Sequence, residues 1–268
     1  MAVNNWKSFL MPYEQAVEEL KIKLKSIRKE YRRKNEYSPI EFVTGRVKEV
    51  ASILEKANKF EIPIDRIGYE LEDIAGIRIM CQFVDDIDKV VEILRQRRDI
   101  TILYEKDYVR NVKPSGYRSY HMIIKYPVYM ANGLVEILAE FQIRTLAMNF
   151  WATIEHSLNY KYKQQLPIDL KSKLKSAADL AFNLDEQMLE IKDEIKDAQK
   201  LFEVKSDIIS KIMNNILTLN SYGRVAEVKR YEQTLNRLVE DGDVAELNEL
   251  LLLIDKDIDR FKEKSKLE

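Results

Sequence analysis

Apolar residues in the first part of the chain recur mostly at intervals of three and four, the spacing of an amphipathic helix. The first such helix is predicted over about residues 6–31, with Trp6, Leu10, Tyr13, Val17, Leu20, Leu24 and Ile27 on one side. A second helix is predicted from Ser38, where a capping hydroxyl precedes a proline at the first helical position and a glutamate three residues beyond the cap. We expect it to reach about Ala57.

The apolar period changes to two from Ile74, which predicts strands. Strands are expected near residues 77–83, 101–105, 119–126 and 134–144, with a helix near 86–98. In the last strand one face carries Val135, Ile137, Ala139, Phe141 and Ile143, while Glu136, Glu140, Gln142 and Arg144 share the other with Leu138. One side of the sheet should therefore pack on helices, and the other is polar enough to form a site. Thr145 can cap a following helix that runs to about residue 162.

The longest predicted element begins after Pro167. Its apolar positions step by four and three from Leu170 to Phe202, a heptad seam that predicts packing along a partner helix, within the chain or across subunits. Beyond residue 205 we expect three shorter amphipathic helices. The last two should meet at residues 241–243, where Asp243 and Glu246 resemble a capping box. These patterns divide the chain into residues 1–204 and a helical extension, residues 205–268.

The composition indicates a globular protein without a large excess of either charge. The 268 residues are enough to bury a full core, and charged residues make up 33% with a formal net charge of -1. The whole molecule is therefore not a generic binder of polyanions. Cys81, the only cysteine, lies in an apolar run and is expected in the core. No signal-like segment and no run of the ~18 apolar residues typical of a membrane span occurs, so we expect a cytoplasmic protein with no membrane contact.

Two carboxylates from separate strands form a candidate metal site. Asp73 lies just before the strand that carries Arg78, and Glu140 lies on the polar face of the 134–144 strand. Such a pair can hold Mg²⁺, which takes one or two carboxylates together with phosphate oxygens and water. The alternative is that both acids are surface residues paired with arginines.

Basic and aromatic residues near these acids can serve phosphates and bases. The basic candidates are Arg46, Lys48, Lys56, Arg78, Lys113, Arg118 and Arg144. Each can instead be solvated surface, although alternation takes Arg78 and Arg144 off the apolar face. Tyr117 can stack on a base or anchor its loop, and His121 can bind phosphate, position a hydroxyl or be a satisfied strand histidine. No glycine-rich phosphate loop is present, so side chains are expected to hold the phosphates.

Five segments carry a family resemblance. Residues 73–78 (DIAGIR), 113–121 (KPSGYRSYH) and 140–145 (EFQIRT) resemble the synthetase motifs of the Rel/Spo alarmone enzymes. Residues 38–46 (SPIEFVTGR) and 148–157 (MNFWATIEHS) are similar to segments of the small, single-domain alarmone synthetases. The resemblance covers about residues 6–200, with several separated motifs in the same order.

The resemblance implies an α/β, nucleotidyltransferase-like mixed sheet flanked by helices, with long C-terminal helices. It implies a GTP/GDP diphosphokinase without a hydrolase domain, which transfers pyrophosphate from ATP to the 3′-hydroxyl of GDP or GTP and yields (p)ppGpp and AMP. Catalysis would then consist mainly of alignment and charge stabilisation.

The same resemblance assigns roles to residues of this sequence. Asp73 and Glu140 would hold Mg²⁺, and Glu140 would also deprotonate the 3′-hydroxyl. The residues implied to bind ATP are Arg46, Lys48, Lys56, Arg78 and Lys106, the last of which stands where similar sequences often have arginine. The residues implied to bind the acceptor are Lys113, Tyr117, His121, Gln142 and Arg144.

Similar enzymes form homotetramers through their terminal helices, which agrees with the heptad seam. Some bind an alarmone in a central cleft, and Lys21, Lys25, Phe42, Thr44 and Asn149 match those positions. The basic stripe over residues 21–34 suits such an effector or a single-stranded RNA regulator, and it can also be a solvated helix face.

Two other functions compete with this one. A toxin-like relative would pyrophosphorylate the 3′ ends of tRNA, or adenine nucleotides. A non-catalytic RNA-binding module would use the same fold, but it has no need of the Asp73 and Glu140 pair. The sequence does not decide the preferred acceptor nucleotide or the role of residues 205–268, which exceed the usual length of the family.

Overall fold

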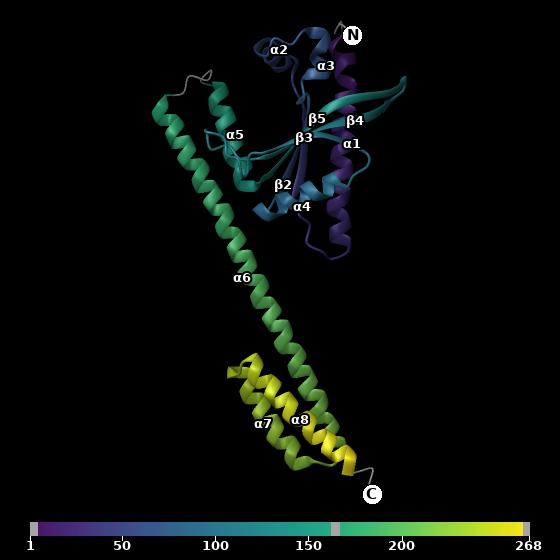
Figure 1. The fold of residues 1–268 in the computed structure, drawn as a ribbon, viewed down its shortest axis with the longest axis vertical. Coiled ribbons are helices and arrows are strands. Elements are labelled where there is room, and N and C mark those ends of the chain that lie inside the picture. The colour runs from purple at the N-terminus through teal and green to yellow at the C-terminus, as the bar shows by residue number, and fades with distance from the viewer. Residues whose placement is uncertain (1–4, 162–166, 265–268) are drawn as a thin grey trace. The chain divides into compact units, whose positions relative to one another are not determined.

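The computed structural model describes residues 5–161 and 167–264, and it divides into two compact units, Met1–Glu190 and Ile191–Glu268 (Figure 1). The first unit is built on a five-stranded sheet with the order β1-β2-β5-β4-β3. Its strands are β1 (Phe42–Val47), β2 (Ala75–Cys81), β3 (Thr101–Asp107), β4 (Tyr120–Met130) and β5 (Gly133–Thr145). Only β2 and β5 pair in parallel, so the predicted mixed sheet is confirmed.

Helices flank this sheet, and the apolar periodicity predicts the longer ones. They are α1 (Trp6–Arg33), α2 (Val50–Lys59), η1 (Ile64–Arg66), α3 (Ile67–Glu70), α4 (Val84–Arg95), α5 (Leu146–Lys161) and the first part of α6 (Ile168–Ser221). Leu20 of α1 and Val90 of α4 belong to one buried cluster with Ile77, Phe141 and Ile143 of the sheet. The predicted cap of α5 is also present, because the Thr145 hydroxyl accepts a hydrogen bond from the Met148 N–H at 3.1 Å.

The prediction of a helix from Ser38 is wrong over residues 38–49. The Ser38 hydroxyl accepts from the Ile40 N–H at 3.2 Å and thus closes a local turn instead of capping a helix. The chain then forms β1, which pairs with β2, and α2 begins only at Val50. Val43 and Val47 alternate with exposed polar residues, and such β-branched positions favour a strand once a neighbouring strand is available.

The two faces of the sheet differ in what covers them. A Cβ atom built on Gly45 would come within 2.7 Å of Val17 Cγ1 and 3.0 Å of Lys21 Cδ, so α1 lies tightly on the face that carries Gly45. Alternation sends Thr44 and Arg46 to the opposite face, where both are exposed. That opposite face carries the polar residues of the candidate site.

The second unit contains residues 191–221 of α6 together with α7 (Val225–Asp241) and α8 (Val244–Lys264). Its buried core draws on all three helices, with Ile212, Leu235 and Ile254 among its members. The capping box at the start of α8 is confirmed: the Glu246 N–H donates to Asp243 Oδ1 at 2.9 Å, and the Asp243 N–H donates to Glu246 Oε2 at 3.1 Å.

One expectation about this region is corrected. The first of the three helices expected beyond residue 205 is not separate, because α6 continues without a break to Ser221. Residues 168–221 contain no glycine or proline, so nothing in the sequence ends the helix earlier. Across the described residues 5–161 and 167–264, the structure has no helix long and apolar enough to cross a membrane.

Candidate active site

The polar face of the sheet is laid out in rows that cross the strands, because residues paired on neighbouring strands point to the same side. One row consists of Arg46, Gly76, Glu140, Ile123 and Tyr104. The next row consists of Thr44, Arg78, Gln142, His121 and Lys106. The register therefore brings seven of the predicted site residues, which are far apart in the sequence, onto one surface.

Asp73 lies in the turn before β2 and is held by two ammonium groups. Its Oδ2 atom lies 2.7 Å from Lys48 Nζ and 2.8 Å from Lys56 Nζ. Burial by itself would raise the pKa of Asp73, but these two lysines lower it below its ordinary value. Its other oxygen, Oδ1, is buried and has no hydrogen-bond partner among the described residues. One oxygen of an ionised carboxylate is thus left for a ligand.

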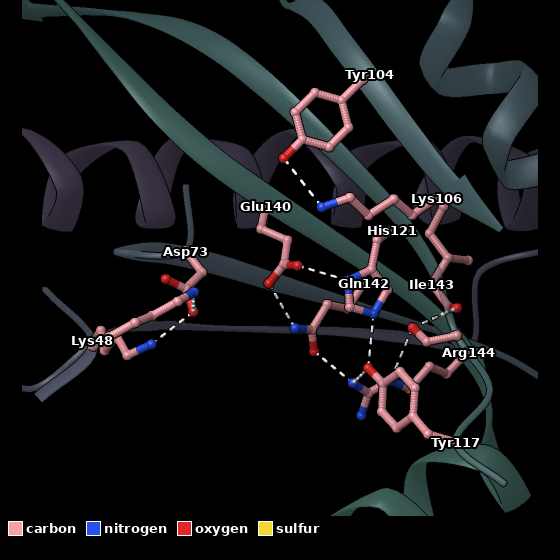
Figure 2. A network of polar contacts seen from close by, with 12 residues as sticks. Lys48, Asp73, Tyr104, Lys106, Tyr117, His121, Glu140, Gln142, Ile143 and Arg144 are labelled. Carbon is pink, nitrogen blue, oxygen red and sulfur yellow. Dashed lines mark hydrogen bonds and ion pairs between the residues drawn. The ribbon is translucent and has the colours of Figure 1, made fainter. Parts of the chain in front are cut away.

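Glu140 is held by a histidine and an amide instead. His121 Nδ1 lies 2.7 Å from its Oε1 atom, and the Gln142 amide donates to its Oε2 atom at 2.7 Å (Figure 2). Burial raises the pKa of Glu140, yet the His121 and Gln142 hydrogen bonds keep it below the ordinary value. The negative charge of Asp73 opposes this lowering, so the two carboxylates lie close enough to interact.

The residues around these acids fit a divalent cation accompanied by phosphates. Gly76 stands beside Glu140 in the register, and a Cβ atom built there would meet only the Arg46 carbonyl oxygen, at 3.8 Å. Space is therefore open above the sheet at Gly76, beside Glu140. Within the described part of the chain no cluster of three or more His, Cys, Asp or Glu side chains is arranged for a metal. Two carboxylates fit Mg²⁺, which obtains its remaining ligands from phosphates and water.

Five side chains form a closed ring of hydrogen bonds beside Glu140. The Arg144 guanidinium donates to the Tyr117 hydroxyl at 2.5 Å and to Gln142 Oε1 at 2.8 Å. The Tyr117 hydroxyl lies 2.7 Å from His121 Nε2, and His121 and Gln142 both reach Glu140 (Figure 2). Arginine can only donate and an ionised carboxylate can only accept, so the bonds through Gln142 run from Arg144 to Glu140. On the other arm, the ionised carboxylate requires a proton on His121 Nδ1.

Cations on the β1 and β2 side of the face form one group. Arg46 is exposed, while Lys48, Lys56 and Arg78 are partly buried. Burial lowers the pKa of Arg78, and the charges of Arg46 and Arg144 lower it further. Arg78 lies close enough to Arg46 and Arg144 for their positive charges to repel. A polyanionic ligand would reduce this repulsion, so the group favours binding of one.

Lys106 lies apart from that group, on β3 at the other edge of the sheet. It pairs in register with His121 and donates to the Tyr104 hydroxyl at 3.3 Å. The structure thus places Lys106 beside the residues expected to bind the acceptor, of which Lys113 is another. Lys113 Nζ lies 4.2 Å from the centre of the Tyr108 ring and 4.9 Å from that of Tyr117.

Several residues of the site were not singled out by sequence reasoning. Tyr108 packs edge-on against both Tyr117 and His121, with ring centres 6.2 and 5.2 Å away. Ser119 is fully buried and accepts from Arg144 Nε at 3.1 Å. Their signal in the sequence is weak, because a tyrosine after a strand and a serine in an aromatic segment have many structural uses.

The residues expected to bind an effector are spread over different surfaces of the first unit. Phe42 and Thr44 are exposed on the polar face of β1, whereas Lys21 packs beside Gly45 on the other face. Lys25 is exposed on α1, and the Asn149 side-chain oxygen on α5 is buried without a hydrogen-bond partner among the described residues.

Comparisons with known proteins agree with this geometry. Residues 45–165 match the region found in RelA / SpoT proteins. The GTP pyrophosphokinase YjbM of Bacillus subtilis (strain 168) is 56% identical over 200 residues, which cover 75% of this chain and 94% of the relative. The structure of the small alarmone synthetase 1 from Bacillus subtilis bound to its product pppGpp has a TM-score of 0.69 and 57% identity, covering 71% of this chain and 97% of that chain. The structure of the same enzyme bound to AMPCPP has a TM-score of 0.64 and 53% identity, covering 72% of this chain and 98% of that chain.

Proposed function

Since the chain belongs to the RelA/SpoT family, among the small alarmone synthetases, we propose that it transfers the β,γ-pyrophosphate of ATP to the 3′-hydroxyl of GDP or GTP. The products are AMP and ppGpp or pppGpp. The similar Bacillus subtilis enzymes are named for this activity, and one was solved with pppGpp. Within this chain, the observation that carries the proposal is the pair of ionised carboxylates, Asp73 and Glu140, set among cations on one face of the sheet.

Asp73 and Glu140 would together hold Mg²⁺, which supplies positive charge to the phosphate oxygens at the reacting phosphorus. The unpartnered Oδ1 atom of Asp73 and the open space beside Gly76 support this assignment. Lys48 and Lys56 keep Asp73 ionised, so its carboxylate is ready to bind a cation at neutral pH.

The ATP phosphates would lie against the cations on the β1 and β2 side. Arg46, Lys48, Lys56 and Arg78 supply that charge, with the arginines offering forked donors to phosphate oxygens. Alignment of a highly charged phosphorus with its nucleophile is most of what pyrophosphate transfer requires of a protein.

The acceptor nucleotide would lie toward β3 and β4. Tyr117 offers a ring on which guanine can stack, and Lys113 supplies positive charge for the acceptor's phosphates. Lys106, which the resemblance assigns to ATP, lies on this side of the face beside His121 and can add to that charge. Arg144, expected to bind the acceptor, is only 5% exposed and would act on it through Tyr117 and Gln142, to which it donates hydrogen bonds. Glu140, ionised and oriented by His121 and Gln142, takes the proton from the 3′-hydroxyl as that oxygen attacks.

Assembly, location and regulation belong to the same proposal. A cytoplasmic homotetramer would bury the exposed seam of α6, in which Leu184, Met188, Ile191 and Ile195 are all exposed. An alarmone effector would use Lys21, Lys25, Phe42, Thr44 and Asn149 from more than one subunit, since one subunit presents them on different surfaces. Single-stranded RNA is the alternative ligand for the basic stripe of α1.

The proposal is tested by incubating the protein with labelled ATP, Mg²⁺ and each of GDP, GTP, ATP or tRNA. We expect equimolar AMP and a guanosine product carrying label at the 3′ position. Label on tRNA or on an adenine nucleotide would identify the toxin-like activity instead. Absence of transfer to every acceptor, from protein shown to be folded, would contradict the proposed reaction.

A further inference from the structure

One face of α6 packs against the segment that carries Tyr117. Within the first unit, residues 174, 178, 181, 182 and 185 of α6 lie at helical spacings of four, three, one and three, so they share one side of the helix. Leu174 and Ala181 pack with Tyr117 around the buried cluster of Trp151, Ala152 and Ala178. The Trp151 indole N–H donates to the Leu174 carbonyl at 2.8 Å. Tyr117, the residue proposed to stack on guanine, therefore packs against α6.

Gly116 leaves no room between this loop and the helix. Its φ is +88°, and a Cβ atom built there would lie 2.6 Å from Ala178 Cβ and 3.4 Å from the Lys175 carbonyl oxygen. The next residue but one, Arg118, places its guanidinium 4.2 Å from the centre of the Phe182 ring and 3.3 Å from Asp179 Oδ1. A small shift of α6 would thus be transmitted directly to residues 116–118.

Asp185 adds a further polar contact to this side of α6, and its surroundings are unusual for a carboxylate. It is 5% exposed, and its only hydrogen-bond partner within the described residues is the Thr145 hydroxyl, 2.5 Å from Oδ2. A buried carboxylate with a neutral partner opposes folding unless it is neutralised. Accordingly, burial raises the pKa of Asp185 to about 6, and its charge at neutral pH is retained at a cost in stability.

Thr145 connects this carboxylate to the acceptor side of the site. It is the last residue of β5, it is fully buried, and its hydroxyl also accepts from the Met148 N–H at the start of α5. A hydroxyl has one proton, so donating it to Asp185 leaves a lone pair for that cap. The preceding residue, Arg144, holds the Tyr117 hydroxyl. Asp185 is therefore tied to Tyr117 twice, through β5 and through the packing of α6.

We propose that Asp185 is a positioning residue for the acceptor nucleotide: by holding Thr145 it fixes α6 and the end of β5, and so the placement of Tyr117. Asp185 does not touch the reacting groups. The inference rests on the proposed transfer reaction. It adds that acceptor affinity depends on Asp185, a residue of α6 that lies outside the sheet.

The test compares Asp185→Asn with Glu186→Gln, which removes the same charge from the next residue of α6, an exposed one. The steady-state rate of transfer is measured first with GDP varied at saturating ATP, and then with ATP varied at saturating GDP. We expect Asp185→Asn to raise the KM for GDP about tenfold and the KM for ATP less than about twofold, with Glu186→Gln unchanged. A merely structural role would raise both constants or lower kcat alone.

Thr145 supplies a second, independent test. Thr145→Val removes the donor of the Thr145–Asp185 hydrogen bond, and Asp185→Asn removes the charge that strengthens its acceptor. Thr145→Val should therefore raise the KM for GDP at least as much as Asp185→Asn does, and the double variant should show no further loss, because both changes act on the same contact. Thr145→Ser keeps the hydroxyl and should behave as the wild type. Calorimetric titration with GDP reads the same affinity without turnover, which separates this inference from the proposed reaction. A KM and a GDP affinity within twofold of wild type in both Asp185→Asn and Thr145→Val would overturn it.

Discussion

At the scale of single residues, the two carboxylates of the site are kept ionised by opposite kinds of partner. Asp73 is paired with two ammonium groups, whereas Glu140 accepts from the ring of His121 and the amide of Gln142. Both arrangements lower the carboxyl pKa against the effect of burial. Each Glu140 oxygen accepts one of these hydrogen bonds, so lone pairs remain for a cation and a substrate proton.

Replacing either carboxylate by its amide should therefore abolish transfer and leave the fold intact. Asp73→Asn and Glu140→Gln keep shape, but they remove the charge that holds the cation and, for Glu140, the proton acceptor. We expect kcat to fall by at least about a hundredfold in each. Product formation is measured by chromatography, and circular dichroism checks the fold. Activity close to wild type in either variant would remove the metal assignment.

The roles proposed for Tyr117 can be separated into one for its ring and one for its hydroxyl. Tyr117→Ala removes the ring, and we expect the KM for the acceptor to rise about tenfold or more while that for ATP changes little. Tyr117→Phe keeps the ring but removes the hydroxyl held by Arg144 and His121, so kcat should fall with a smaller change in acceptor KM. Equal effects of Tyr117→Ala on both substrates would contradict stacking.

Asp185 should show a trade between stability and acceptor affinity. Its pKa is raised to about 6, so the unfolded chain releases this proton more readily than the folded one. The contribution of Asp185 to the free energy of unfolding is therefore largest below about pH 4, the ordinary pKa of a carboxyl group. This contribution is lost as the pH rises through about 6, the pKa in the folded state. At pH 7 the variant Asp185→Asn should gain up to roughly 3 kcal/mol of unfolding free energy over wild type, a difference that vanishes near pH 4. Urea unfolding at both pH values measures it, and a less stable variant at pH 7 would contradict the expectation.

At the scale of elements, periodicity predicted most of the sheet and its helices, and it failed where tertiary pairing decided the outcome. The alternation in β5 identified Glu140, Gln142 and Arg144 as one face, and the register confirms that alternation. Residues 42–47 were misread as helix because a short segment with valines four apart fits both periods. No pattern relates positions forty residues apart on different elements, so the contact between Thr145 and Asp185 was beyond sequence reasoning.

The contact between residues 116–118 and α6 can be tested at Gly116. Gly116→Ala suffers both from the positive φ and from the approach of Ala178, whereas Gly133→Ala, at φ +117° with nothing within 4 Å, suffers only from the backbone. We expect Gly116→Ala to lose about 1–3 kcal/mol more unfolding free energy than Gly133→Ala, and to raise the acceptor KM as well. Thermal unfolding measures the loss of stability, and steady-state kinetics measure the acceptor KM. Equal losses in the two variants would show that the helix does not confine the loop.

At the scale of the whole molecule, about a quarter of the chain lies outside the match to YjbM, which covers 75% of it. The second unit has its own buried core, so its helices need no contact with the catalytic unit to be stable. The predicted division at residue 204 stays a prediction about function, while the compact units divide within α6. What the second unit leaves uncovered is the apolar seam, which continues from Ile191 to Phe202.

That seam predicts how copies of the chain associate. Met188 and Ile195 are exposed, so Met188→Glu and Ile195→Glu should not disturb the packing of one chain. Placed at a helix interface, however, two buried carboxylates without partners would prevent association. We expect analytical ultracentrifugation to show a tetramer for the wild type and smaller species for the double variant, with Lys200→Glu, on another side of the helix, as the control. A wild-type monomer, or an unchanged assembly in the double variant, would show that the seam is not the interface, and α6 would then need another occupant for its apolar stripe.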